Sequence, residues 1–301
     1  MNDRGHQNQA LVSVVIPVRD GVDHIGRAIE SALRQSWRPI EVIVVDDGSS
    51  DGTTAVVEGF GDPVCLIRQA AAGPAAARNR GIRQAQGDYI ALLDADDVWL
   101  PGRVERTVRP MIEDDSIGLC YCRCTLEGRR QAVHRHVGKK LHPDGIYAPD
   151  GLFTPAATLR REAFEQVGGY DDAMNQCEDI DLFVRIAERY EVRRIEAALV
   201  VVSDRPDSHS KVGRHPGRAA DMVLYYHAKA LVRRPERYGR LGAISAACRI
   251  GGIFHFDAGR YRTARGYFGA SWWLRPTVGS LVLFMRTFLP KWVNRWVRRI
   301  K

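Results

Sequence analysis

The first hundred residues alternate between two patterns of hydrophobic and polar positions. Continuous apolar runs, typical of strands covered on both faces, occur at 11–17, 41–47, 64–69 and 88–94. Between them, apolar residues recur at helical spacing, for example Ile25, Ala28 and Ile29. The pattern predicts helices over 25–33, from about 53, over 74–86 and over 101–113, the last with Pro101 at the first helical position. This alternation indicates an α/β sheet with crossover helices.

The pattern is less regular beyond residue 113. The sequence IGLCYCRC predicts a strand that places three cysteines on one face, Cys120, Cys122 and Cys124. Buried thiols are favoured over a metal cluster, because no Cys or His partners follow at zinc spacing. The polar segment 128–151 predicts a loop or lid, and its irregularly spaced histidines favour a solvated loop over a metal site. Residues 177–190 predict a helix.

Polar side chains stand at the carboxyl ends of three predicted strands. They are Arg19 and Asp20, then Asp46 and Asp47, then Asp94, Asp96 and Asp97. Because ligands of such sheets bind beyond the carboxyl ends of the strands, we expect these groups to converge on one crevice. A dinucleotide-binding site is excluded, because VRDGVDHIG follows the first strand where a G-x-G-x-x-G turn would be needed.

The acidic group Asp94, Asp96 and Asp97 predicts a divalent cation. Clustered carboxylates repel one another unless a cation neutralises them. Mg²⁺ or Mn²⁺ fits best, because hard cations take oxygen ligands and bridge carboxylates to phosphates. The alternative is a solvated acidic turn, or Asp97 acting as a helix N-cap.

Charge divides the chain into an acidic and a basic part. The net charge is +8, yet residues 211–301 contain 19 basic and 3 acidic residues, a balance of +16, which leaves −8 for residues 1–210. With 45% hydrophobic residues the chain can form a full core and is not a disordered protein. The polar N-terminal residues lack the apolar segment of a secretory signal, so we expect no such signal. No apolar run of membrane-spanning length occurs, so we expect no transmembrane helix.

The basic C-terminal end predicts a membrane surface as a partner. Residues 291–301 place Trp292 and Trp296 on one helical face and arginines on the other, and the apolar segment 281–289 precedes them. This pattern is typical of interfacial helices on an anionic membrane. The alternative is an apolar helix packed on the preceding domain. Nucleic acid is not expected as a partner, because no recognised binding motif accompanies the charge.

Six motifs in order carry a family resemblance. They are SVVIPVRD (13–20), VVDDGSSDGT (44–53), GPAAARNRG (73–81), DYIALLDADDVWLP (88–101), VGGYDD (167–172) and EDIDLFVR (178–185). Together they resemble a bacterial family 2 glycosyltransferase, over about residues 11–210. The resemblance implies the GT-A fold, a Rossmann-like mixed sheet flanked by helices, here with a C-terminal helical extension. It divides the chain into a polar tail (1–10), a catalytic domain (11–210) and a basic helical region (211–301).

The resemblance also implies roles for individual residues. The nucleotide-sugar would be bound by Pro17, Val18, Arg19, Asp46, Asp47, Arg78, Asp94, Ala95 and Asp96. Within that set, Asp47 would accept a hydrogen bond from the base, and Arg78 would approach the nucleotide or its diphosphate. The cation, Mn²⁺ or Mg²⁺, would be bound by Asp96 directly, with Asp94, Asp97 and His209.

On the opposite side of the sugar, Asp179 matches the general base of the family, with Glu178 beside it. The acceptor would border Gly168, Gly169, Tyr170 and Asp181. Two alternatives remain open: Glu178 and Asp179 as ordinary acids of a helix N-terminus, and Asp181 either as the base or as a brace for Arg185 one helical turn away.

The resulting expectation is a metal-dependent, inverting hexosyltransferase. It would transfer a sugar from a nucleotide-diphosphate donor, with UDP favoured, to a saccharide or lipid-linked acceptor in cell-surface polysaccharide synthesis. We expect a cytoplasmic protein, peripheral on the inner face of the plasma membrane. One alternative is a non-catalytic, membrane-associated module that binds nucleotide-sugars; a sugar-phosphate nucleotidyltransferase is disfavoured, because no G-x-G-T-R-like loop follows the first strand.

Overall fold

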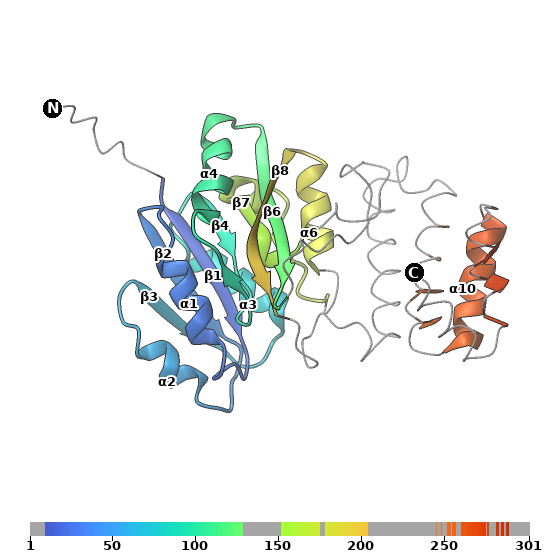
Figure 1. Cartoon of the computed structure of the whole chain (residues 1–301), viewed down its shortest axis with the longest axis horizontal. Coiled ribbons are helices and arrows are strands. Elements are labelled where there is room, and N and C mark those ends of the chain that lie inside the picture. The colour runs from blue at the N-terminus through green and yellow to red at the C-terminus, as the bar shows by residue number, and fades with distance from the viewer. Residues whose placement is uncertain are drawn as a thin grey trace. The chain divides into compact units, whose positions relative to one another are not determined.

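The computed structural model of the 301-residue chain describes residues 10–128, 152–174, 178–203, 260–274 and further positions between 245 and 288. The chain divides into two compact units, residues 1–141 with 147–205 and residues 142–146 with 206–301. The first unit holds the sheet and the second holds helix α10 (Figure 1). The predicted boundary at 210, the loop 129–151, His209 and the tail 291–301 lie outside the described residues.

The first unit is built on one mixed sheet of eight strands. These are β1 (Val12–Val18), β2 (Ile40–Asp46), β3 (Val64–Arg68), β4 (Tyr89–Leu92), β5 (Val98–Trp99), β6 (Ile117–Leu126), β7 (Ala157–Arg160) and β8 (Glu191–Val202). Their order is β3-β2-β1-β4-β7-β6-β8-β5. The first four in this order are parallel, β7 is antiparallel to both β4 and β6, and β5 is antiparallel to β8. The predicted parallel strands are therefore confirmed.

Helices cover both faces of this sheet. They are α1 (Ile25–Leu33), α2 (Thr53–Glu58), α3 (Pro74–Gln84), α4 (Arg103–Glu113), α5 (Arg161–Gln166) and α6 (Glu178–Ala187), with a 3₁₀ turn, η1 (Thr154–Ala156). The prediction of Pro101 at the first helical position was wrong. Gly102 has a left-handed backbone with φ 76° and precedes the first helical residue, Arg103. The N-cap alternative for Asp97 was also wrong, because a strand follows it.

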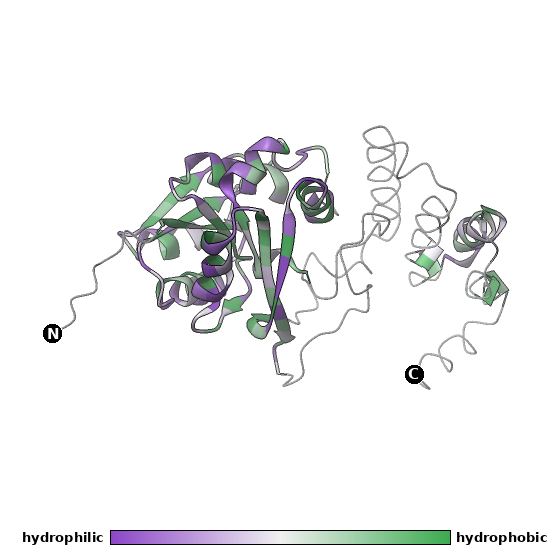
Figure 2. Ribbon diagram, turned by 90° about the horizontal axis from the view of Figure 1, so that it is seen from above, coloured by the Kyte–Doolittle hydropathy of each residue, from purple (hydrophilic) through white to green (hydrophobic). Residues whose placement is uncertain are grey.

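Two hydrophobic clusters lie on opposite faces of the sheet, because side chains alternate along each strand. In β1, Val14 and Ile16 pack in the cluster that includes residues of α1 and α4. Val15 packs in the other cluster, with residues of α3, α5 and α6. Figure 2 shows hydrophobic residues along the strands between these helices. The continuous apolar runs of the sequence thus belong to strands that are buried on both faces.

The three cysteines of β6 share one face, as predicted, and are buried free thiols. Burial raises the pKa of Cys120 to about 12, although the nearby Arg103 opposes the shift. Among the described residues, no group of three or more His, Cys, Asp or Glu is arranged to hold a metal ion.

The second unit has a small core around α10 (Tyr261–Leu274). Phe256, Ala264 and Phe268 are buried, and Phe284 packs against them. Several large apolar side chains are exposed nearby in sequence: Trp272, Trp273, Leu281, Val282, Met285 and Phe288. Within the described residues, no helix is both long and apolar enough to cross a bilayer.

Helix α3 approaches the sheet closely at Gly81. A Cβ atom there would lie 2.6 Å from Val15 Cγ1 and 3.0 Å from Val45 Cγ2. Both neighbours are buried strand residues, so they cannot move aside easily. The glycine therefore fixes the distance between α3 and the sheet.

Replacing Gly81 by Ala should lower the free energy of unfolding by about 1–3 kcal/mol, the usual cost of overpacking a core. Gly26→Ala in α1 is the matched control, because the nearest atom to its added Cβ lies at 3.8 Å and alanine favours a helix. Urea unfolding of both variants measures the difference. Equal stabilities of the two variants would contradict the close packing at Gly81.

Candidate active site

The carboxyl ends of β1, β2 and β4 lie together because the three strands are parallel and paired. Val18 of β1 is the partner of Asp46 of β2, and the Asp47 amide donates to the Val18 carbonyl at 2.8 Å. The Leu93 amide, one residue beyond β4, donates to the Val15 carbonyl. The sheet therefore brings the three predicted groups of polar residues to one edge.

The end of β1 exposes its polar residues. Val18 is buried, whereas Arg19 and Asp20 are exposed and form an ion pair at 3.8 Å. Asp20 has a left-handed backbone, with φ 49°, and its carboxylate accepts a hydrogen bond from the Ser50 amide at 2.7 Å. Pro17 is half-buried. The Arg19 side chain is thus accessible to a ligand at the strand end.

Asp46 and Asp47 organise the loops that follow β2 and β3. Burial by itself would raise the pKa of Asp46, but hydrogen bonds from Ser49 and Thr54 outweigh it and hold that pKa below its ordinary value. The Asp47 carboxylate accepts from the Ala72 and Gly73 amides, both at 2.8 Å. Asp47 therefore fixes the backbone just before α3, and its contact with a base stays a prediction.

The acidic segment after β4 places its carboxylates at different depths. Asp94 and Asp96 are half-buried, and Ala95 packs against the core. Asp97 is only 4% exposed and accepts a hydrogen bond from the Ser203 amide at 2.8 Å. Burial, together with the charges of Asp94 and Asp96, raises the pKa of Asp97 to about 9. Burial and the neighbouring carboxylates thus make ionisation of Asp97 unfavourable, a cost that a nearby positive charge would lower.

Arg78 of α3 joins this segment to α6. Its Nη2 donates to Asp94 Oδ1 at 2.7 Å and its Nη1 donates to Glu178 Oε1 at 3.0 Å. The side chain is buried, and its guanidinium lies 5.7 Å from the centre of the Tyr170 ring. Burial would lower the pKa of Arg78, but Asp94 and the other neighbours outweigh it and raise that pKa. Sequence reasoning missed this bridge, because its partners are distant in the chain.

Glu178 and Asp179 form the first turn of α6, as predicted from the pattern. Burial and the charge of Asp179 raise the pKa of Glu178, and Arg78 only partly compensates. Asp179 is half-buried, and its Oδ2 accepts a hydrogen bond from Thr154 Oγ1 at 3.1 Å. Both carboxylates thus contact residues outside their own helix, which ordinary N-terminal acids need not do.

The Gly168–Tyr170 loop is clamped by Asn79 of α3. The Asn79 side chain donates to the Tyr170 carbonyl and accepts from the Tyr170 amide, both at 2.9 Å. Gly168 and Gly169 have φ of 83° and 73°, and a Cβ at Gly169 would lie 2.9 Å from Asn79 Oδ1. Burial raises the pKa of the Tyr170 phenol. Asn79 stands in the AARNRG motif, but nothing in the sequence pointed to its partner.

The structure favours the bracing alternative for Asp181. Its side chain is fully buried and bonds Arg185, with 2.7 Å between Asp181 Oδ2 and Arg185 Nη2. Arg185 in turn donates to the carbonyls of Val167 and Gly169. Asp181 therefore supports the Gly168–Tyr170 loop through Arg185.

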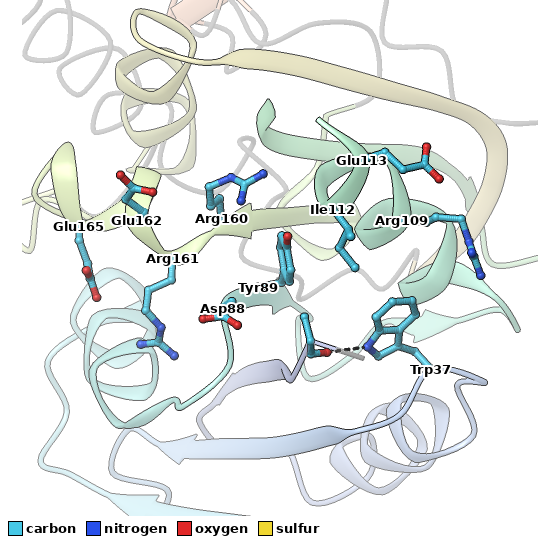
Figure 3. Close-up of a pocket in the computed structure, with 11 residues that line it drawn as sticks. Trp37, Asp88, Tyr89, Arg109, Ile112, Glu113, Arg160, Arg161, Glu162 and Glu165 are labelled. Carbon is cyan, nitrogen blue, oxygen red and sulfur yellow. Dashed lines mark hydrogen bonds between the residues drawn. The ribbon is translucent and has the colours of Figure 1, made fainter. Parts of the chain in front are cut away.

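A separate hollow of about 550 Å³ lies at the opposite end of the sheet, where β4 begins (Figure 3). Trp37, Tyr89, Arg160 and Arg161 are among its lining residues. The two arginines donate to backbone carbonyls, Arg160 Nε to Ile117 at 3.2 Å and Arg161 Nε to Gly87 at 2.8 Å. These contacts connect the ends of neighbouring strands, so the two arginines have a structural role.

Arg78→Lys should lower the free energy of unfolding by about 2 kcal/mol, because an ammonium cannot reach both carboxylates and one charge-assisted hydrogen bond is lost. Arg34→Lys is the control, since its pair with Glu30 is exposed and is worth less than about 1 kcal/mol. Urea unfolding compares the two. A loss at Arg78 no larger than at Arg34 would show that the bridge does not hold the site together.

Comparison with known proteins places this chain in a family. The family described as glycosyl transferase family 2 matches residues 13–168, slightly more than half of the chain. An uncharacterised glycosyltransferase of Rickettsia typhi is 29% identical over 196 residues, which is 60% of this chain and 60% of that protein's own length.

Two solved structures show the same fold. A mannosyltransferase from Pyrobaculum calidifontis, in complex with GDP-Man and Mn²⁺, has a TM-score of 0.62 at 20% identity and covers 95% of this chain and 82% of its own. TarS 1–349 from S. aureus has a TM-score of 0.61 at 16% identity, covering 88% and 81%. The predicted fold, a mixed α/β sheet with flanking helices as in GT-A glycosyltransferases, is confirmed, and the chain belongs to glycosyl transferase family 2.

Proposed function

We propose that this chain is a metal-dependent, inverting glycosyltransferase that uses a nucleotide-diphosphate sugar, with UDP as the nucleotide. The observation that carries the proposal is the Arg78 bridge, which holds Asp94 at the strand ends and Glu178 beside Asp179 within one site. A transferase needs both groups of carboxylates, one near the leaving group and one near the acceptor. Relatives support the donor type, since TarS was solved with UDP-GlcNAc and the P. calidifontis enzyme with GDP-Man.

The nucleotide end of the sugar donor would bind where β1, β2 and β4 end. Arg19 is exposed there, and Asp46 and Asp47 hold the surrounding loops in place. Arg78 would hold Asp94 in position while its positive charge faces the diphosphate region. These residues supply the polar contacts that fix a ligand in an α/β crevice.

Asp96 and Asp94 would hold a divalent cation, Mn²⁺ or Mg²⁺. The residues fit such an ion, because Asp94 and Asp96 are half-buried carboxylates that supply oxygen ligands, and a cation beside them would also lower the cost of ionising the buried Asp97. Such ions are commonly bound by one or two carboxylates together with substrate phosphates, so a complete protein cage is not required. His209 would be a further ligand. A bound cation supplies charge stabilisation for the departing diphosphate.

Asp179 would act as the general base. The acceptor hydroxyl transfers its proton to the Asp179 carboxylate as its oxygen bonds the anomeric carbon, and the bond from that carbon to the diphosphate breaks. Attack opposite the leaving group inverts the anomeric centre. Glu178 would remain bound to Arg78, so that only Asp179 is available for the proton. The Gly168–Tyr170 loop, clamped by Asn79, would border the acceptor.

The acceptor would be a saccharide or a lipid-linked saccharide used in cell-surface polysaccharide synthesis, reached at the inner face of the plasma membrane. The second unit supports a membrane surface as partner. Trp273 is 79% exposed, and Met285 and Phe288 are more than half exposed. The basic excess of residues 211–301 would complement anionic headgroups.

Asp179→Asn should retain binding of the sugar donor while transfer falls about 10²–10⁴-fold, the contribution typical of a general base. The assay measures binding and release of nucleoside diphosphate with a panel of UDP- and GDP-sugars, with Mn²⁺, with Mg²⁺ and with a chelator. Asp88→Asn, the same change at the opposite end of the sheet, is the control and should keep full activity.

Several outcomes separate the possibilities. Unchanged transfer by Asp179→Asn would remove that residue from the mechanism. Donor binding by the wild-type chain without any turnover would favour the non-catalytic binding module, and full activity in chelator would contradict the metal requirement.

Removing residues 289–301 should abolish sedimentation with vesicles that contain phosphatidylglycerol, and Trp273→Ser should weaken it. This deletion keeps Phe284, which packs on the core of the second unit. Vesicles of phosphatidylcholine alone serve as the control for charge. Undiminished sedimentation of the truncated chain would rule out the tail as the anchor.

A further inference from the structure

We propose that Thr154 is a positioning residue for Asp179, and that Trp99 and Arg103 hold the turn from which it acts. The inference rests on the proposed function, because it concerns the carboxylate that would serve as the base. Neither the motifs nor the periodicity of the sequence pointed to Thr154.

The contact between Thr154 and Asp179 fixes the carboxylate. Thr154 is 6% exposed, and its hydroxyl donates to Asp179 Oδ2 at 3.1 Å. The other oxygen, Oδ1, accepts from the Ile180 amide at 2.8 Å. One hydrogen bond on each oxygen restricts rotation of the carboxylate about its terminal torsion, which otherwise has a broad minimum. Each oxygen keeps a second lone pair that can take a proton.

The turn that carries Thr154 is itself held by side chains from the segment after the acidic motif. Trp99 Nε1 donates to the Pro155 carbonyl at 2.8 Å. Arg103 Nη2 donates to the Ala157 carbonyl at 2.7 Å, and its Nη1 donates to Thr158 Oγ1 at the same distance. Trp99 and Arg103 therefore hold three of the four residues that follow Thr154, namely Pro155, Ala157 and Thr158.

Burying the charged Arg103 side chain costs desolvation free energy, which its contacts with the turn have to offset. The side chain is fully buried, its guanidinium lies 4.2 Å from the centre of the Trp99 ring, and its Nη1 and Nη2 donate to neutral oxygens of the 155–158 segment. Burial lowers its pKa. An apolar residue of similar volume would fill the space at a smaller desolvation cost, but it could not hold the carbonyls of the turn.

Trp99 and Arg103 also connect the acidic segment after β4 with the carboxylates at the start of α6. β5, which contains Trp99, directly follows Asp96 and Asp97, and the Trp99 amide donates to Ser31 Oγ at 3.1 Å. The segment that would carry the metal ligands thus continues into the residues that hold the turn whose Thr154 contacts Asp179. Trp99 and Arg103 form a second link between the two carboxylate groups, in addition to Arg78.

The test compares Thr154→Val, which keeps the shape and removes the hydroxyl, with Thr154→Ser, which keeps the hydroxyl. With UDP-GlcNAc or GDP-mannose as the sugar donor, whichever the panel shows to be turned over, Thr154→Val should lower kcat about 10–100-fold, the scale produced by misplacing a reacting group. The KM for the sugar donor should change less than about twofold, and Thr154→Ser should restore most of kcat. Thr287→Val, a buried threonine in the second unit, is the matched control.

A second variant and a structural measurement keep the test decisive. Trp99→Phe removes the indole donor to Pro155 and should give the same split between kcat and KM, with a smaller loss. In crystals of Thr154→Val, the Asp179 carboxylate should adopt a different terminal torsion from that in the wild-type chain, a readout that does not depend on turnover.

Wild-type kcat in Thr154→Val, while Asp179→Asn is inactive, would overturn the inference and leave the proposed function intact. An unchanged Asp179 torsion in the Thr154→Val crystals would also overturn it. If instead no sugar of the panel is turned over by the wild-type chain, the proposed function fails, and the crystals alone decide whether Thr154 positions the carboxylate.

Discussion

The candidate site depends on one buried guanidinium. Arg78 bonds Asp94, 16 residues away, and Glu178, 100 residues away, and thereby joins the end of β4 to the start of α6. Without that charge, the carboxylates of Asp94 and Glu178 would lack their positively charged partner. Unpaired carboxylates are among the most costly groups to hold in a protein interior. The bridge explains how acidic segments from distant parts of the chain can stand in one site before any cation or substrate is bound.

Helix α3 carries this guanidinium and is fixed at three places. Asp47 accepts hydrogen bonds from the Ala72 and Gly73 amides, so the loop after β2 holds the start of the helix. Gly81 lets the helix lie against β1 and β2. Asn79, next to Arg78, clamps the backbone of Tyr170 and so ties the Gly168–Tyr170 loop to the same helix. The loop after β2, the acidic segment after β4 and the Gly168–Tyr170 loop are therefore all connected to one helix.

The parts of this structure that could be predicted from the sequence are those with local signals. Continuous apolar runs gave the parallel strands, helical periodicity gave most of the helices, and the family motifs named the carboxylates that the sheet brings to one edge. The start of α4 was missed because the left-handed backbone at Gly102 is a local conformation that the proline pattern does not reveal. β5 was missed because a two-residue strand is stabilised only by pairing with β8, about 100 residues later. The contacts of Arg78, Asn79 and Thr154 likewise join residues far apart in the chain, and such contacts produce no periodic pattern in the sequence.

The central claim is that one carboxylate, Asp179, faces the sugar from the side opposite the leaving diphosphate. The stereochemistry of the product tests it most directly. Wild-type protein is incubated with an α-linked UDP-sugar that it turns over and with its acceptor, and the anomeric proton of the new linkage is observed by NMR as it forms. The account predicts a β-linkage as the first product. An α-linkage would mean retention of configuration and would contradict the single displacement that the arrangement of Asp94, Arg78, Glu178 and Asp179 supports.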